Sequence, residues 1–379
     1  MIRTRDEDVC PGTLQAHSAA DGGLARVRLP GGMISSAQLS ALARVASSAG
    51  SGILELTSRG GVQLRGITDL CAVVDAATAA NLLPSITHDR VRNIVSSPLS
   101  GRSGGFGDVR PWVGRLDDAI QNSAALASLP GRFLFGIDDG RGDVAQLEAD
   151  VGVRVLDDAA APSVALSLAG VDTGVRLTAA AAIPAMITVA KRFTQQRGKH
   201  WRIREMSDRS TLLEAFGIDR SPLHPLPTTT APPVGWIEQE DGRIAVGAAV
   251  PFGVVHAGVA HAMAAFGAPL IVTPWRSVLL CDLDGADAVD ALRTLAPRGL
   301  VFDKASPWLQ ISACVGNQGC RHSATDVRAD ATAAVEAARD AGKRQHWVGC
   351  QRACGSPPRG EVLVATGAGY RRLTPEVRD

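Results

Sequence analysis

The chain has 379 residues, of which 45% are hydrophobic, 20% are charged and 4% are aromatic. This length suffices for two or three compact units, and the composition is that of a globular protein rather than a disordered one. The 39 Lys and Arg residues nearly balance the 38 Asp and Glu residues, so a formal net charge of +1 gives no general attraction to nucleic acid. With a single Tyr, there is also little surface on which nucleic-acid bases could stack.

The N-terminal sequence "MIRTRDEDVCPG" lacks the apolar stretch of a secretory signal. The seven cysteines are odd in number and unevenly spaced, which favours a reducing compartment, and we expect a cytoplasmic protein. Residues 244–275 include no Asp, Glu, Lys or Arg, but their prolines and histidines favour a packed strand, turn, helix and strand over a membrane span. We therefore predict neither a membrane nor a nucleic acid as a partner.

The first predicted elements recur later in the chain. Residues 25–67 indicate a strand, a Pro-Gly turn, a helix of small apolar residues, a second strand, a turn that begins with Thr57 and contains Arg59, and a third strand. Residues 243–283 repeat this order, with Thr273 and Arg276 in the corresponding turn. A separation of about two hundred residues favours a duplicated α+β unit over a solenoid repeat. Chance similarity is the alternative.

Composition also predicts the boundaries between units. A Pro-rich linker occupies residues 221–235, "SPLHPLPTTTAPPVG". We expect the duplicated units at 1–85 and 236–303, a mixed α/β unit at 86–220, and a smaller unit at 304–379. If the chain is duplicated, 86–220 is the counterpart of 304–379. Because 86–220 contains no cysteine, only one half of the molecule would then carry a thiolate site.

Four of the seven cysteines lie in the last unit, as the pairs Cys314–Cys320 and Cys350–Cys354. A strand is predicted to end at Cys314, another to precede Cys350, and a third to follow Cys354. We expect a helix after Cys320, begun by the capping-box pattern 323–326, with its end at residue 342. The positive end of that helix would favour an anionic group bound by the thiolates.

Four thiolates from two short loops favour a [4Fe–4S] cluster. Structural zinc, which prefers pairs with two to four intervening residues, is an alternative, and so are ordinary buried thiols. The other cysteines, Cys10, Cys71 and Cys281, are isolated and are interpreted as small buried hydrophobic residues.

Several motifs together resemble the nitrite and sulfite reductase superfamily. These are "TSRGGVQLR" (57–65), "VRNIVSSPLSG" (91–101), "LPGRFLFGIDDG" (129–140) and the C-terminal pattern C-x5-C…C-x3-C. The resemblance covers nearly the whole chain and implies an α+β fold with pseudo-two-fold symmetry, ferredoxin-like halves at 1–85 and 236–303, and reductase-like domains at 86–220 and 304–379. It also implies a cluster beside a sirohaem, with Cys354 as the bridging ligand.

The chain departs from the reductases at one informative block. Two lysines that flank a Phe bind the anionic substrate in the reductases, and Arg132 and Leu134 flank Phe133 here. Losing a buried cation weakens the case for reducing sulfite or nitrite, because the oxyanion needs such donors. The opening "CPGTLQAHSAADGGLARVRLPGG" and the later "VGCQRACGSP" resemble instead the precorrin-3B synthase family, a branch of the superfamily in the cobalamin pathway.

That second resemblance implies an O2-dependent monooxygenase. Its tetrapyrrole substrate, precorrin-3A, would be hydroxylated and would form a lactone. The implied cofactors are a [4Fe–4S] cluster and a mononuclear non-haem iron, with O2 as cosubstrate. A sirohaem-dependent sulfite or nitrite reductase is the first alternative, and a zinc-stapled protein without catalysis is the remote one.

Arginines are expected to bind the carboxylates of the tetrapyrrole, because the planar guanidinium pairs with a carboxylate through two hydrogen bonds. Arg59, Arg92 and Arg132 match motif positions of the superfamily, and Arg65 and Arg276 are further candidates.

Ligands for the iron are not evident from the sequence. A site of two histidines and a carboxylate is usual for such iron. His256, His261, His322 and His346 are available, but His256 and His261 are five residues apart and share a helix face poorly. The Gly-rich stretch 101–107 lacks the G-x-G-x-x-G spacing of dinucleotide sites, so we expect electrons from a separate donor protein.

Overall fold

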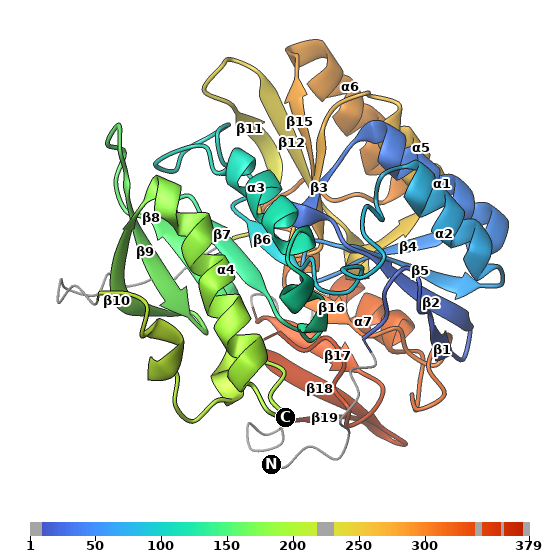
Figure 1. Cartoon of the computed structure of the whole chain (residues 1–379). Coiled ribbons are helices and arrows are strands. Elements are labelled where there is room, and N and C mark those ends of the chain that lie inside the picture. The colour runs from blue at the N-terminus through green and yellow to red at the C-terminus, as the bar shows by residue number, and fades with distance from the viewer. Residues whose placement is uncertain (1–9, 218–230, 338–342, 358–359, 374–379) are drawn as a thin grey trace.

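The computed structural model describes residues 10–217, 231–337, 343–357 and 360–373, which form four sheets (Figure 1). The first sheet has the order β1-β2-β5-β4-β13 and the second has the order β11-β12-β15-β14-β3. The strands of the first are β1 (His17–Ala19), β2 (Gly22–Val27), β4 (Ile53–Leu56), β5 (Val62–Ile67) and β13 (Val254–His256). Those of the second are β11 (Gly235–Glu238), β12 (Ile244–Ala249), β14 (Leu270–Val272), β15 (Ser277–Leu283) and β3 (Met33–Ile34).

These two sheets exchange strands. Strand β3, from the first copy of the repeat, pairs with β14 of the second copy, and β13 of the second copy pairs with β4 of the first. The two sheets therefore have the same strand order and are related as the predicted duplication requires. The fold is α+β with pseudo-two-fold symmetry, as predicted from the resemblance.

Four helices pack with these sheets: α1 (Ser36–Ala49), α2 (Leu70–Ala79), α5 (Ala257–Ala264) and α6 (Gly285–Leu295). Helix α1 begins where Ser35 and Gln38 cap each other's backbone N–H groups, and its buried face combines leucines with small residues such as Ala43 and Ala46. Small residues allow close approach, and α1 packs against its counterpart α5. One hydrophobic core therefore joins both copies.

Corresponding turns of the two copies have different residue types at the positions with positive φ. The turn η1 (Pro30–Gly32) contains Gly31 with φ 63°, whereas η6 (Pro251–Gly253) contains Phe252 with φ 56°. In the turn that begins with Thr57, Gly60 has φ 68°. The corresponding residue in the turn that begins with Thr273 is Arg276, with φ 59°. The N–H groups of both bond the carbonyl of the Thr that begins their turn. Each copy thus has the predicted turn that begins with Thr and contains Arg, but Arg59 and Arg276 occupy different positions of that turn.

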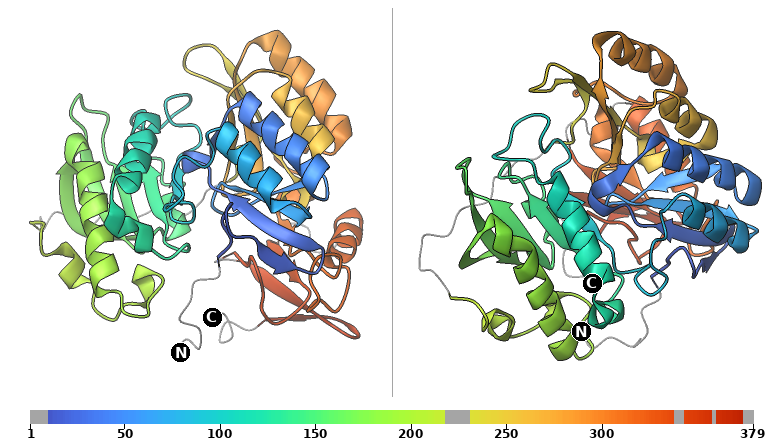
Figure 2. Two further views of the ribbon diagram at one scale, coloured as in Figure 1. Left: turned by 45° about the vertical axis from the view of Figure 1, so that its right-hand side comes forward. Right: turned by 45° about the horizontal axis from the view of Figure 1, so that its top comes forward.

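The third sheet, β10-β9-β8-β7-β6, forms a separate layer with two helices on one face (Figure 2). Its elements are β6 (Ile94–Ser96), α3 (Arg110–Gln121), β7 (Phe135–Asp138), β8 (Val151–Val155), β9 (Ser163–Leu168), β10 (Val171–Thr178) and α4 (Ala179–Gln196). In its core, the Phe133 ring contacts the rings of both Phe135 and Phe193.

The fourth sheet, β16-β17-β18-β19, has α7 packed on it. Its elements are β16 (Ile311–Ala313), α7 (Val327–Glu336), β17 (Gln345–Val348), β18 (Glu361–Thr366) and β19 (Gly369–Arg372). In the fourth sheet, the parallel strands β16, β17 and β18 are followed by the antiparallel strand β19. In the third sheet, β6, β7, β8 and β9 have the same arrangement, so 86–220 and 304–379 share a topology. Short 3-10 helices complete the fold at η2 (Ala124–Ser128), η3 (Ala145–Leu147), η4 (Ile203–Glu205), η5 (Ser210–Leu213), η7 (Ala296–Arg298) and η8 (Pro307–Leu309).

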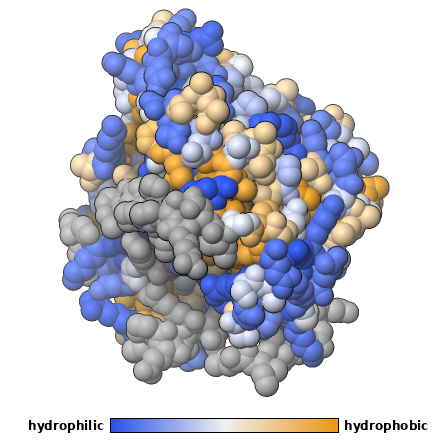
Figure 3. All heavy atoms as spheres, turned by 60° about the vertical axis from the view of Figure 1, so that its left-hand side comes forward, coloured by the Kyte–Doolittle hydropathy of each residue, from blue (hydrophilic) through white to orange (hydrophobic). Residues whose placement is uncertain are grey.

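Within the described residues, no helix combines the length and apolarity needed to span a bilayer. The charge-free segment 244–275 forms β12, η6, β13, α5 and β14, as predicted. Most of the predicted linker, and the predicted helix end at residue 342, lie outside the described residues. Figure 3 shows a face of the molecule on which apolar residues gather near the middle, with hydrophilic residues around them.

Candidate functional site

The four-cysteine site lies at the carboxyl ends of two parallel strands. Ala313 at the end of β16 is in register with Trp347 in β17, so the residues that follow these strands are neighbours. The Cys314 N–H donates to the Trp347 carbonyl at 2.9 Å, and the Gly349 N–H donates to Cys314 Sγ at 3.3 Å. The first cysteine of each pair is therefore placed by the sheet itself.

Two turns place the other cysteines. The Ser323 N–H donates to the Cys320 carbonyl at 3.0 Å, and the Ala353 N–H donates to the Cys350 carbonyl at 3.2 Å. The two loops also contact each other, because the Ala324 N–H donates to the carbonyl of Gly349. Any side chain at Gly349 would collide with Ser323, so the loops meet only because this residue is Gly.

The thiols are close enough to affect one another's charge. The pKa of Cys354 is raised, first by burial and then by the negative charge of the other three cysteines. No three of the four sulfur atoms lie within 4.8 Å of one another. A tetrahedral zinc with Zn–S bonds of about 2.3 Å would hold its sulfurs about 3.8 Å apart. The four sulfurs are therefore not grouped as a preformed tetrahedral zinc site would hold them.

The predicted start of the helix beside Cys320 is wrong. Helix α7 begins at Val327, and Asp326 caps it by accepting the Ala329 N–H at 3.2 Å. Ser323 does not cap the helix, because its hydroxyl donates to the Thr325 carbonyl within the turn. The cysteine loop is therefore organised by turns and by the neighbouring loop, and α7 begins seven residues after Cys320.

The isolated cysteines differ in burial. Cys281 lies in β15 and is fully buried, as predicted. Cys10 is partly buried, and its charge acts on Arg26, Arg28 and Arg59. Cys71 is exposed on α2, so its interpretation as a buried residue is wrong.

His346 contacts the second cysteine loop through a hydrogen bond. Its side chain is fully buried, with Nδ1 at 2.8 Å from Ser312 Oγ and Nε2 at 3.0 Å from the Cys354 carbonyl oxygen. Burial, above all, lowers the pKa of His346 to about 4. Both ring nitrogens of this histidine are therefore engaged by the protein.

The other candidate histidines do not gather. His256 precedes α5 and is exposed, and His261 lies on that helix with Nδ1 at 3.3 Å from Ser40 Oγ. His322 is exposed in the first cysteine loop. Within the described residues, no two histidines and a carboxylate come together as ligands for one ion.

Two of the five predicted arginines occupy salt bridges. Arg92 is buried and binds both carboxylate oxygens of Asp117 in α3 at 2.7 Å. Arg65 binds both carboxylate oxygens of Asp21 at 2.9 Å, and it also donates to the carbonyl of Gly319, between the first two cysteines, at 2.9 Å. Arg65 therefore joins the first copy of the repeat to a cysteine loop.

Arg59 and Arg132 lie in a different environment. Arg59 Nη1 donates to the Gly131 carbonyl at 3.0 Å, and the Arg132 guanidinium lies 5.1 Å from the centre of the Trp201 ring. The pKa of Arg59 is lowered to about 10, first by burial and then by the charges of Arg202 and Arg26. These contacts leave both guanidiniums without a bound carboxylate in the described structure.

Two further arginines belong to this group and were missed in the sequence. Arg26 lies in β2 and Arg28 follows it, and the charges of Arg26 and Arg132 act on each other. Arg28 is 4% exposed, and its Nε and Nη1 atoms have no hydrogen-bond partner. The pKa of Arg28 is lowered to about 9, first by burial and then by Arg26 and Arg59. We call Arg26, Arg28, Arg59 and Arg132 the arginine cradle.

A signal for the missed pair was present in the sequence. In "ARVRLP" the arginines alternate with apolar residues, which is the pattern of a strand with one polar face. Burial of Arg28 against the third-sheet domain could not be seen from the strand alone.

Arg276 is separate from the cradle. Its Nη2 atom would lie 3.0 Å from a Cβ placed on Gly355, directly after Cys354. The pKa of Arg276 is lowered mainly by burial. The structure thus divides the five predicted arginines among three environments: the cradle, the salt bridges and the cysteine loops.

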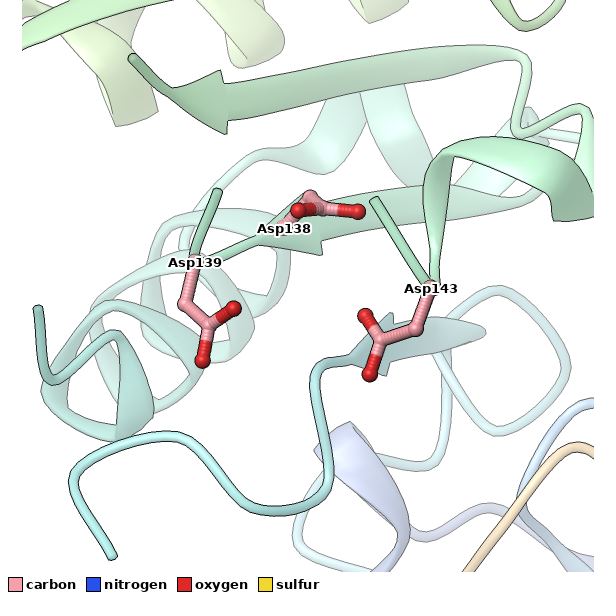
Figure 4. A group of neighbouring side chains, drawn as sticks. All are labelled: Asp138, Asp139 and Asp143. Atoms are coloured by element: carbon pink, nitrogen blue, oxygen red, sulfur yellow. The ribbon is translucent and has the colours of Figure 1, made fainter. Parts of the chain in front are cut away.

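One other group could hold an ion by distance alone. The carboxylates of Asp138, at the end of β7, and of Asp139 and Asp143, in the loop that follows, lie within 4.8 Å of one another (Figure 4). This is the counterpart of the loop after β17 that carries Cys350 and Cys354. Their oxygens have protein donors: four backbone N–H groups between residues 140 and 145 for Asp138, Arg141 for Asp139, and Ser97 for Asp143.

Comparison with known proteins agrees with this geometry. Residues 17–80 match the nitrite/sulfite reductase ferredoxin-like half domain. The chain is 26% identical to a precorrin-3B synthase of Sinorhizobium sp, covering 95% of this chain and 81% of that protein. It is 24% identical to a ferredoxin–nitrite reductase of Synechococcus elongatus, covering 88% and 74%.

Among solved structures, the NirA protein of Mycobacterium tuberculosis superposes with a TM-score of 0.76 at 17% identity, covering 93% of this chain and 77% of that one. The fold is therefore that of the nitrite and sulfite reductases, and the predicted resemblance to precorrin-3B synthase is confirmed.

Proposed function

We propose that the chain is a precorrin-3B synthase, a cytoplasmic O2-dependent monooxygenase that hydroxylates precorrin-3A and forms a lactone in cobalamin biosynthesis. The observation that carries this proposal is the arginine cradle, in which four guanidiniums gather without a bound carboxylate. The similarity to a precorrin-3B synthase over 95% of the chain supports the choice of reaction.

The cradle suits a tetrapyrrole with a carboxylate-rich rim. Bringing cations together with little compensation costs free energy, and an anionic ligand that pairs with them recovers it. Arg28 and Arg59 would each bind a carboxylate, while Arg132, held against Trp201, would close the edge of the site. Arg92 and Arg65 would position these elements through their salt bridges and would not touch the substrate.

The cysteine site suits a [4Fe–4S] cluster. Cys314, Cys320, Cys350 and Cys354 would hold it, and their sulfurs are not grouped as a preformed tetrahedral zinc site would hold them. Such a cluster supplies single electrons. Within this chain, Gly349 and Ser323 set the distance between the two loops, and His346 fixes the Cys354 carbonyl.

The expected non-haem iron finds no matching ligand set among the described residues, since their histidines do not meet with a carboxylate. We therefore assign no residue to it and derive no step through it.

Monooxygenation also needs an electron source. One oxygen atom of O2 enters the substrate and the other leaves as water, which consumes two electrons and two protons. A separate donor protein would supply the electrons. Arg321, Arg352, Arg371 and Arg372 are exposed in the cysteine-bearing domain, which favours a donor with an acidic surface.

A sirohaem-dependent sulfite or nitrite reductase is the second candidate, because the cradle could equally hold the carboxylates of a haem. Under this alternative Cys354 would bridge cluster and haem. The replacement of two lysines by Arg132 and Leu134 disfavours it.

The test is to purify the protein without oxygen and to measure iron, acid-labile sulfide, zinc and visible absorption. We expect iron and sulfide without a sirohaem band, and conversion of precorrin-3A with O2 and a reductant to a product that carries one additional oxygen atom. A sirohaem band would support the reductase. Zinc without sulfide would support the zinc-stapled protein.

A further inference from the structure

Arg276 has a backbone conformation that disfavours any residue with a side chain. Its φ of 59° lies in the left-handed region, where the first copy of the repeat has Gly60. The turn itself does not require an arginine, because Gly60 forms the same hydrogen bond to the preceding threonine. A strained residue that persists where Gly would suffice indicates a role for its side chain.

The side chain of Arg276 runs toward the cysteine loops. Its Cδ atom would lie 3.0 Å from a Cβ on Gly253, and its Nη2 atom would lie 3.0 Å from a Cβ on Gly355. Two glycines thus leave room for the arginine along its length. The charge of Arg276 also acts on His346, which contacts the Cys354 carbonyl.

The guanidinium of Arg276 has no hydrogen bond or ion pair to another described residue. Glu55 is the anion whose charge acts on it, but the Glu55 carboxylate already contacts Arg65, Arg328 and Gln63. Arg276 is partly buried, and a partly buried cation without a bonded anion is stabilised when a negative group occupies the adjacent site. The Nη2 atom lies beside Gly355, which directly follows Cys354 in the second cysteine loop.

We propose that Arg276 is the electrostatic partner of the group bound by the four cysteines and that it stabilises the reduced form of a cluster there. This inference rests on the proposed [4Fe–4S] cluster. An iron–sulfur cluster with four thiolates is anionic and gains another negative charge on reduction, so a fixed cation nearby raises its reduction potential. Arg276 is then a positioning residue for the cluster and not a ligand of the tetrapyrrole.

The experiment compares Arg276→Gln, Arg276→Lys and Arg276→Gly with Arg59→Gln as the matched control from the cradle. The midpoint potential is measured by electron paramagnetic resonance during a redox titration without substrate, beside iron and sulfide content. Arg276→Gln should keep the cluster but lower its potential by about 59 mV, which corresponds to a tenfold fall in the ratio of reduced to oxidised cluster. Arg276→Lys should restore part of this loss, and Arg59→Gln should have the wild-type potential.

The backbone strain at Arg276 gives a second measurement, because a merely structural residue would not combine a gain in stability with a loss of cluster potential. Arg276→Gly should raise the melting temperature of the cluster-free protein, since Gly accepts the left-handed conformation, and should still lower the cluster potential. An unchanged potential in Arg276→Gln with full cluster content overturns the inference. Weaker binding of a carboxylate-rich porphyrin at unchanged potential assigns Arg276 to the substrate and also overturns it. A wild-type protein without iron and sulfide instead contradicts the proposed cluster itself.

Discussion

The arginines of this chain are distinguished by the group that faces each guanidinium. Arg92 faces Asp117 and Arg65 faces Asp21, whereas Arg28 is bonded to no carboxylate of the described residues. Identical side chains therefore stabilise the fold at some positions and destabilise the ligand-free protein at another.

The cradle predicts that Arg28→Met stabilises the ligand-free protein by about 1–2 kcal/mol, because it removes a buried unpaired charge and keeps most of the apolar contact. The same change should weaken the binding of a carboxylate-rich porphyrin at least tenfold. Urea unfolding and fluorescence titration measure the two effects. Arg243→Met, at an exposed pair with Asp241, should change neither. Lower stability together with unchanged porphyrin affinity would show that Arg28 is a structural residue.

Asp143 gives a pH-dependent prediction. Burial first, and then the charge of Asp138, raise the pKa of Asp143 to about 7. A carboxyl group with a raised folded-state pKa binds its proton more tightly when folded, so its contribution to stability is full below about pH 4 and is lost as pH rises to about 7.

Asp143→Asn should therefore raise the free energy of unfolding by roughly 2 kcal/mol at pH 8 and by much less at pH 4, since the coupled neighbour Asp138 shares the full effect. Urea unfolding at both pH values checks this. Equal effects of the substitution at pH 4 and pH 8 would contradict it.

The sequence was informative at the residue scale where chemistry is local. Four cysteines in two short spacings predicted a thiolate site directly. The arginines could not be sorted in this way, because the partners of Arg92 and Arg65 are 25 and 44 residues distant in sequence. The sequence also did not show that Arg276 corresponds to Gly60, because a Gly and an Arg can occupy the same turn position.

At the scale of elements, parallel strands and close loop packing create the cysteine site. The ends of β16 and β17 place Cys314 beside Gly349, and the second loop then fits only against a residue without a side chain. The strands predicted to end at Cys314, to precede Cys350 and to follow Cys354 are confirmed as β16, β17 and β18, whereas the predicted helix start was too early. Turn hydrogen bonds from residues 323–325 competed with the capping pattern there.

Gly349→Ala should therefore reduce iron and sulfide content several-fold, because it forces the two cysteine loops apart. Gly367→Ala is the control, since open space surrounds a Cβ there. Metal and sulfide analysis after anaerobic purification measures the outcome, and circular dichroism confirms that both variants fold. Full cluster content in Gly349→Ala would show that the loops are not held at this contact.

At the scale of the whole molecule, charged contacts join the domains across the duplicated core. Arg102, in the loop after β6, binds both carboxylate oxygens of Asp282 in β15, at 2.7 and 2.8 Å. Hydrogen bonding by Arg102 is the main reason that the pKa of Asp282 is lowered to about 2.

Asp282→Asn should lower the free energy of unfolding by about 1–2 kcal/mol at pH 7, after allowance for partial exposure of the pair. A carboxyl with a lowered folded-state pKa stabilises the fold above about pH 4 and loses this effect as pH falls toward 2, so the difference from wild type should shrink in acid. Asn tolerates the positive φ of this position, so the substitution isolates the charge. A difference that stays constant between pH 7 and pH 3 would exclude the ion pair as its cause.

The duplication was predictable at this scale, since the order of elements repeats in the sequence. The exchange of strands was not, because β3 has two residues and no pattern of its own. Its place is fixed by the distant β14, more than two hundred residues later.

This exchange means that neither half of the duplicated core is a complete unit. Cutting the chain between the halves would leave each sheet with a vacant edge shaped for a strand that the other fragment carries. Two copies of one half could fill each other's edges, which is the arrangement expected of a symmetric homodimeric ancestor. Because one chain carries both halves, the two halves can differ in sequence, and in this chain only the second half has the two closely spaced cysteine pairs.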